Sequence, residues 1–102
     1  MMKIEEIVGD IVLIVLDSHD PLKKIGIEQD KIFVKVKGYD ENGIWIHHPS
    51  FHIPELSENK DGKTKNLEAS ILIPWAFIIS IAHFPGADGL DFPSPFNRSI
   101  GF

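Results

Sequence analysis

Residues 67–83 constrain the fold of this chain more than any other segment. They form two apolar runs, Leu67–Ile73 and Phe77–His83, with only three residues between them. Pro74 follows the first run and cannot donate a ladder hydrogen bond, so the first strand is expected to end there. Three residues are the length of a single 3₁₀ turn. The sequence therefore predicts two strands joined by one tight turn, as at the end of small closed β-barrels.

The second of these runs is apolar on both faces. Regular alternation places Phe77, Ile79 and Ile81 on one face, and Ile78 and Ala82 on the other. A domain of this size has one core and cannot bury both faces by itself. The bare edge of so apolar a strand would also be prone to aggregation. We therefore expect an identical subunit to cover part of it, with an interface formed by Phe77, Ile78, Ile79 and Ile81.

Composition limits the kinds of site that the chain can carry. Its 102 residues fit one domain and include no cysteine, which excludes disulfides, thiolate metal ligands and cysteine nucleophiles. No apolar run approaches the ~20 residues of a spanning helix. We expect a cytoplasmic protein without membrane contact, cofactor or metal. The formal net charge of −5 disfavours broad binding to phosphate backbones.

The first 30 residues are expected to form a short helix, a strand and a loop. Lys3–Val8 has one apolar helical face and is followed by Gly9, which suits a helix end. Asp10–Asp17 reads as a strand covered on both sides, although one helix over Lys3–Leu16 competes with this interpretation. Ser18–Asp30 is rich in turn-forming residues and is predicted to be a loop.

A hairpin is expected in the middle of the chain. Lys31–Tyr39 alternates strictly, with apolar residues on one face and three lysines with Phe33 on the other. The Asn-Gly pair within Asp40–Gly43 is typical of a tight hairpin turn. The returning strand, Ile44–His48, is predicted to end at Pro49. The long polar loop that follows, Ser50–Asn66, is alternatively a hairpin extension of the flanking strands.

The chain divides into a barrel domain over residues 1–84 and a tail over residues 85–102. The tail is rich in proline, glycine and phenylalanine. Its expected anchors are Phe92, Phe96 and Phe102. These side chains pack either on their own barrel or on a neighbouring subunit, and the sequence does not separate the two arrangements.

Two short motifs resemble the Sm-like family of small barrels. The family's closing segment typically reads as two apolar residues, Ile-Arg-Gly, two residues, Ile, two residues and a last apolar residue. The spacing of Ile-Leu-Ile-Pro-Trp-Ala-Phe-Ile-Ile-Ser-Ile at residues 71–81 follows it. The Gly-Tyr-Asp-Glu-Asn-Gly-Ile run at residues 38–44 looks like the family's earlier Gly, Asp and Asn motif. Pro74-Trp75 replaces the Arg-Gly pair, the turn from Asp40 is about one residue short, and the loop at residues 18–30 is longer than usual.

The resemblance implies a mostly β fold: a five-stranded, strongly bent Sm-like barrel with a short N-terminal helix and an irregular C-terminal tail. It implies a homo-oligomeric ring, of about five to eight copies, in which neighbouring closing strands pair. Single-stranded RNA would bind in the lumen, near Asp40, Asn42 and Trp75. A barrel of the Src-homology type closes in a similar way and is the alternative fold.

Other candidate sites have a plain structural explanation beside the functional one. His47, His48 and His52 could suggest a metal, but His47 and His48 are neighbours on a strand and point to opposite faces. The residue types of a hydrolytic triad occur together in Asp17-Ser18-His19-Asp20. We interpret this segment as a turn, because the residues of real triads come from distant segments of the chain.

Two aromatic positions could serve either binding or packing. The basic face of Lys31, Lys35 and Lys37 around Phe33 suits nucleic acid or simple solubility. Trp75 either stacks on a base or plugs the barrel end or the subunit interface.

No convergent acid, base and nucleophile can be assembled from the sequence, so no catalytic residue is expected and the chain is not predicted to be an enzyme. Two binding functions remain. One is a ring that engages RNA. The alternative is an oligomeric scaffold or adaptor that binds protein partners through the tail or the long loop and does not bind RNA.

Overall fold

Five strands form one antiparallel sheet in the computed structural model, which describes residues 3–53, 65–86 and 92–93. The strands are β1 (Ile11–Leu16), β2 (Lys31–Tyr39), β3 (Gly43–Ile53), β4 (Lys65–Pro74) and β5 (Ile78–His83). Three short 3₁₀ helices accompany them: η1 (Ile4–Ile7), η2 (Asp20–Ile25) and η3 (Trp75–Phe77). The mostly β fold with a short N-terminal helix is confirmed. No helix in the described ranges is long and apolar enough to cross a membrane.

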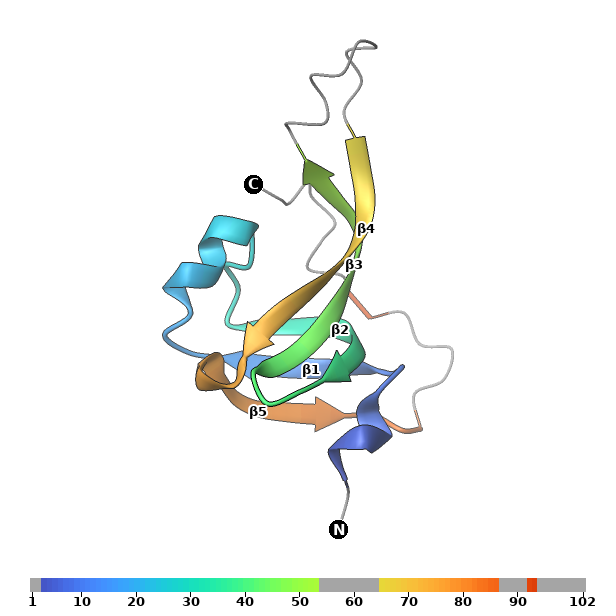
Figure 1. Ribbon diagram of the computed structural model, residues 1–102. Coiled ribbons are helices and arrows are strands. Elements are labelled where there is room, and N and C mark those ends of the chain that lie inside the picture. Colours follow the sequence, from blue (N-terminus) through green and yellow to red (C-terminus); the bar gives the residue numbers. More distant parts are fainter. Residues whose placement is uncertain (1–2, 54–64, 87–91, 94–102) are drawn as a thin grey trace.

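The sheet is open, in contrast to the expected closed barrel. Its strand order is β4-β3-β2-β1-β5, so β4 and β5 form the two edges. The one-turn helix η3 between them redirects the chain, and β5 pairs with β1 instead of returning along β4. Figure 1 shows β3 and β4 running on together as a bent ribbon beyond the other strands. Within the described residues, each edge strand therefore has one side without a strand partner.

One face of the sheet supplies the hydrophobic core. Every second residue of β2 points inward, and Ile32, Val34 and Val36 are all buried, whereas the lysines that alternate with them along the strand are exposed and Phe33 is half-buried. The same alternation buries residues of the other strands: Val12, Ile14, Leu16, Ile44, Ile46, Ile71 and Ile73. The outer face of β1 is less well covered than expected, since Ile11 is 39% exposed.

The N-terminal helix is shorter and tighter than an α-helix. Ile7 is buried against the core, which anchors η1. Gly9 adopts a positive φ of 91°, a conformation that glycine reaches without steric cost, and its N–H donates to the Val36 carbonyl at 2.8 Å. This turn separates η1 from β1 and excludes the competing interpretation of one helix over Lys3–Leu16.

The prediction that Ser18–Asp30 is only a loop was wrong, because it contains η2. Pro21 lies in the first turn of η2, where a missing N–H costs nothing. Gly26 ends the helix in the left-handed conformation, with φ of 90°. Leu22 and Ile27 are buried and hold η2 against the core. The turn-rich composition of the segment concealed these two apolar anchors.

The hairpin of β3 and β4 is longer than predicted. β3 does not end at Pro49 but continues to Ile53, and β4 begins at Lys65, so the alternative of an extended hairpin is the correct one. The register shifts between His48 and Phe51. Pro49 lies in this irregularity, where a missing donor is tolerated. Residues 54–64 of the predicted loop lie outside the described part of the chain.

The alternation predicted for β5 was also wrong, because the strand carries a bulge. Ile14 pairs with Ile81 and Leu16 pairs with Ile78, so Ile79 is an extra residue with no partner on β1. Ile78 and Ile81 consequently both pack against the core, as does Phe77. Ile79 does not share their face and is 64% exposed. The predicted 3₁₀ turn before β5 is confirmed as η3.

The described part of the tail packs on its own chain. The ring centroid of Phe92 lies 5.1 Å from that of Phe33 on β2 and 5.6 Å from that of Phe84. For Phe92, this favours the first of the two arrangements left open by the sequence. The other expected anchors, Phe96 and Phe102, lie outside the described residues.

Gly43 is expected to tolerate no side chain. A Cβ atom there would lie 2.8 Å from both the Ile73 carbonyl carbon and the Pro74 Cα, which are backbone atoms of the paired strand. Gly43→Ala should lower the free energy of unfolding in urea by about 1–3 kcal/mol. Gly38→Ala is the matched control, because its Cβ would meet no atom within 4 Å. Equal stabilities of the two variants would contradict this interpretation.

Candidate nucleic-acid interface

The turn between β2 and β3 is organised by the Asp40 carboxylate. Asp40 Oδ1 accepts hydrogen bonds from the backbone N–H groups of Asn42, at 2.8 Å, and Gly43, at 3.2 Å. The Asp40 N–H donates to the Gly43 carbonyl at 3.0 Å, which closes the hairpin. An aspartate that bonds the backbone two and three residues ahead is a common way to stabilise a tight turn. The Asp-Glu-Asn-Gly sequence therefore folds locally as predicted.

Two tryptophans converge on the same aspartate. The Trp45 indole N–H donates to Asp40 Oδ2 at 2.9 Å, and the Trp75 indole N–H donates to the Asp40 carbonyl at 2.9 Å. The Trp75 backbone N–H donates to the Asn42 carbonyl at 3.2 Å. We call Asp40, Asn42, Trp45 and Trp75 the tryptophan corner. It joins the β2–β3 turn to η3, which lies more than 30 residues further along the chain.

The three residues implied by the Sm-like resemblance thus lie together. Asp40, Asn42 and Trp75 are linked by direct hydrogen bonds. Asn42 is exposed, whereas Trp75 is half-buried and packs partly against the core. Part of the Trp75 side chain covers the core and part reaches solvent, so stacking on a base stays a prediction.

Sequence reasoning missed Trp45 as a member of the corner. Alternation along Ile44–His48 placed its side chain on the outer face, which is where it lies. Its hydrogen bond to Asp40 depends on the approach of the indole across the turn. The sequence offered one signal for this contact: the indole N–H donor of Trp45 follows the Asn-Gly turn by two residues.

Hydrogen bonding favours the charged form of Asp40. The Trp45 indole N–H is the largest influence that lowers the pKa of the carboxyl below its ordinary value, followed by the Asn42 N–H. Partial desolvation opposes these effects, and the Gly43 N–H adds to them. Because both carboxylate oxygens already accept protein donors, Asp40 positions the corner. Asn42 and the Trp75 ring remain as the groups able to contact a ligand.

Tyr39 ties the corner to the N-terminal helix. Its hydroxyl donates to Glu5 Oε2 at 3.2 Å. The pKa of Tyr39 is raised by desolvation, then by the negative charge of Glu5 and by the hydrogen bond itself. This contact fixes η1 beside the end of β2.

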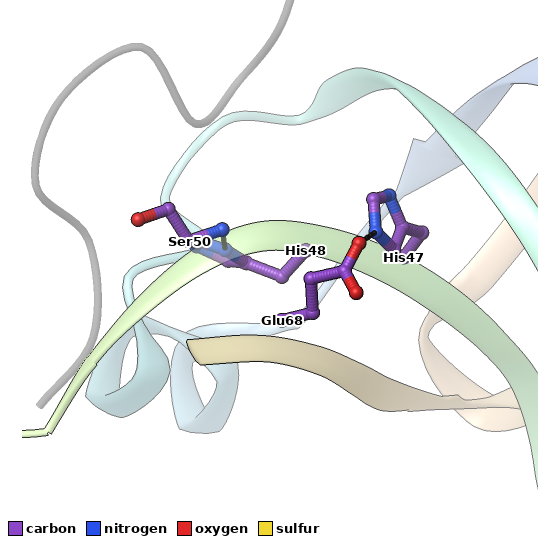
Figure 2. Close-up of polar contacts among 4 residues, drawn as sticks. All are labelled: His47, His48, Ser50 and Glu68. Atoms are coloured by element: carbon purple, nitrogen blue, oxygen red, sulfur yellow. Dashed lines mark hydrogen bonds and ion pairs between the residues drawn. The ribbon is translucent and has the colours of Figure 1, made fainter. Parts of the chain in front are cut away.

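His47 and His48 lie on opposite sides of β3, as the alternation predicted. Figure 2 shows His47 and Glu68 pointing toward one another, with His47 Nε2 lying 3.2 Å from Glu68 Oε1. His48 points to the opposite side of β3, where it is buried, and its Nδ1 accepts the Ser50 N–H at 3.1 Å. Burial is the main cause that lowers the pKa of His48, and the neighbouring His47 adds to it. Within the described residues, no group of three or more His, Asp or Glu side chains is placed to hold a metal.

The triad-like letters around Ser18 do not come together as a catalytic group. His19 is buried, and its Nε2 lies 4.0 Å from Asp30, which belongs to neither end of the motif. Asp20 pairs instead with Lys23 at 3.2 Å. Ser18 has a positive φ of 55°, typical of a turn residue. The plain interpretation as a turn leading into η2 accounts for all these contacts.

The basic face of β2 is only partly available. Lys31, Lys35 and Lys37 are exposed, as expected. Phe33 between them is half-buried, because Phe84 and Phe92 cover its ring. The lysines therefore flank a packed aromatic cluster and not an open stacking platform.

The ionised Asp40 carboxylate should stabilise the fold in a pH-dependent manner. Its pKa is lowered on folding, so the stabilisation is complete above the ordinary value of 3.8 and is lost as pH falls through the lower folded value. The difference in unfolding free energy between wild type and Asp40→Asn should therefore shrink as the pH is taken below 3.8 in a urea series.

Trp45→Phe should raise the Asp40 pKa measured by NMR. An unchanged pKa would show that Trp45 is not its main determinant.

No protein-family model, curated protein or solved structure matches the chain. The resemblance to Sm-like barrels therefore stays a prediction from the residue patterns at 38–44 and 71–81.

Proposed function

We propose that this chain is a subunit of an Sm-like homo-oligomeric ring whose tryptophan corner binds single-stranded RNA. The observation that carries the proposal is the direct hydrogen bonding of Asp40, Asn42 and Trp75 across two distant turns. A loop pair held in this way presents an aromatic ring and an amide side chain on a rigid support. Rigid presentation lowers the entropic cost of binding.

Base stacking is the main source of affinity in this proposal. The exposed part of the Trp75 ring takes the face of one base, and the Asn42 amide offers a donor and an acceptor to its edge. Asp40 orients both groups without contacting the ligand. The net charge of −5 implies few phosphate contacts, so the affinity should depend only weakly on salt.

Assembly is supported by the two edge strands. Within the described residues, β4 pairs only with β3 and β5 pairs only with β1. Apolar side chains are exposed on both edges, with Leu67 at 44% and Ile79 at 64%. Pairing β5 of one copy with β4 of the next satisfies the backbone groups of both edges and covers these side chains. A head-to-tail contact of this type closes into a ring when its rotation permits.

A scaffold without RNA is the second candidate. It is favoured by the acidic net charge and by the Asp40 carboxylate, whose two oxygens are already engaged. Pro74 and Trp75 also replace the Arg-Gly pair that helps to hold a base in RNA-binding Sm-like proteins. In this version the same ring binds protein partners through its tail or through the long polar loop at residues 50–66.

RNA binding can be tested with labelled U-rich and A-rich oligoribonucleotides at low salt. Trp75→Ala should weaken binding by about 1–3 kcal/mol, because one stacking contact is lost, and Trp75→Phe should retain most of it. Phe84→Ala removes an exposed aromatic outside the corner and should have no effect. Circular dichroism checks that each variant is folded. Absence of binding to both oligonucleotides at micromolar protein would favour the scaffold.

Assembly can be tested by light scattering coupled to size exclusion. The wild type should elute as one closed oligomer. Ile79→Lys should shift it to monomers, because a charge on the exposed bulge of β5 would have to be buried in the interface. Val8→Lys is the matched control. Val8 is an aliphatic residue like Ile79 and is 41% exposed, but it lies outside both edge strands, so this substitution should leave the oligomer intact. A monomeric wild type would remove the basis of the ring.

A further inference from the structure

Three phenylalanines form a cluster on the outer face of the sheet, away from the core and from the tryptophan corner. Phe33 projects from β2, Phe84 follows the end of β5, and Phe92 comes from the tail. The Phe33 and Phe92 rings are stacked at 5.1 Å, and Phe84 lies 6.2 Å from Phe33 and 5.6 Å from Phe92. We call Phe33 and Phe84 the phenylalanine cradle, because the Phe92 ring rests on both.

The contact between Phe92 and the phenylalanine cradle is apolar and partly exposed to solvent. Phe84 is 39% exposed and Phe92 is half-buried. In the described part of the chain, Phe92 and Pro93 take part in no hydrogen bond or ion pair, and Phe92 is held by its two ring contacts. A contact of this kind can open without leaving a buried polar group unpaired. On this argument the Phe92 ring can leave the cradle and another ring can take its place.

A hollow next to Phe92 extends the same surface toward β3. Its volume is about 150 Å³, and its described lining includes Lys35, His47, Pro49, Phe92 and Pro93. Lys31 and Lys35 are exposed on either side of Phe33 along β2. The surface thus combines an aromatic seat, space beside the proline that follows, and positive charge close by.

We propose that the phenylalanine cradle is a docking site for a Phe-Pro segment of a partner protein, with an acidic residue before the phenylalanine. The chain's own Asp91-Phe92-Pro93 has this chemistry and supplies the occupant in cis. The phenylalanine stacks on Phe33 and Phe84, and the acidic residue is drawn to the lysines of β2. The proline fixes the backbone after the anchor and so lowers the entropy lost on binding. This site depends on neither RNA binding nor ring formation.

The cis occupant should compete strongly with a partner. Phe84 and Phe92 are only eight positions apart in the sequence, and short linkers give effective concentrations near millimolar. A segment that binds the free cradle with a Kd of about 100 µM is then weakened roughly tenfold in the wild type. Partner binding consequently requires release of the tail.

The test uses the full-length chain and a fluorescent peptide of residues 89–94, Gly-Leu-Asp-Phe-Pro-Ser. Fluorescence anisotropy should show that Phe92→Ala, with its cradle vacant, binds the peptide about tenfold more tightly than the wild type does. Phe92→Leu, which keeps apolar cover, should lie between them. The same peptide with alanine in place of phenylalanine should not bind either chain.

A second substitution locates the site. In the Phe92→Ala background, Phe33→Leu keeps an apolar side chain but removes the stacking ring, and peptide binding should be lost while circular dichroism shows a folded sheet. In the wild type, excess peptide should shift the ring resonances of Phe33 and Phe84 in NMR spectra. Equal peptide affinity of the wild type and Phe92→Ala, or binding that survives Phe33→Leu, would overturn the proposal and leave Phe92 as a simple cover of the sheet.

Discussion

One-sided burial is the constraint on which the whole structure depends. The strands are rich in isoleucine and valine, but a chain of this length encloses a single apolar core, so only one face of each strand can be removed from water. The inward residues of β2, from Ile32 to Val36, set the pattern that the neighbouring strands follow. The proposed sites all lie outside this core, on the two sheet edges, the turns and the outer face of the sheet.

Regular alternation made the middle of the fold predictable. The strand Lys31–Tyr39 and the Asp40–Gly43 turn follow directly from local sequence, because period-2 burial and an Asn-Gly turn are local effects. The strands around Pro49 and Ile79 did not follow, since both contain irregularities in pairing. A bulge arises from the fit of two strands distant in sequence. Counting along a single strand cannot reveal it.

The tryptophan corner could be predicted from the sequence only in part. The resemblance to Sm-like motifs brought Asp40, Asn42 and Trp75 into consideration together, and the hydrogen bonds show that they meet. It gave no reason to include Trp45, whose indole N–H has the largest influence on the Asp40 carboxylate. Side-chain contacts across a turn depend on rotamer and approach, and these emerge only when the strands are assembled.

The extra residue in β5 also governs what can join the sheet at that edge. A straight strand laid along Ile78–His83 would lose its matching contacts at Ile79, where the backbone bends out of step with β1. The bulge therefore makes continuous pairing along this edge less favourable than pairing along a regular strand would be. A bulge of this kind is one of the devices by which natural sheets oppose indiscriminate edge pairing, and here it coincides with the exposed Ile79.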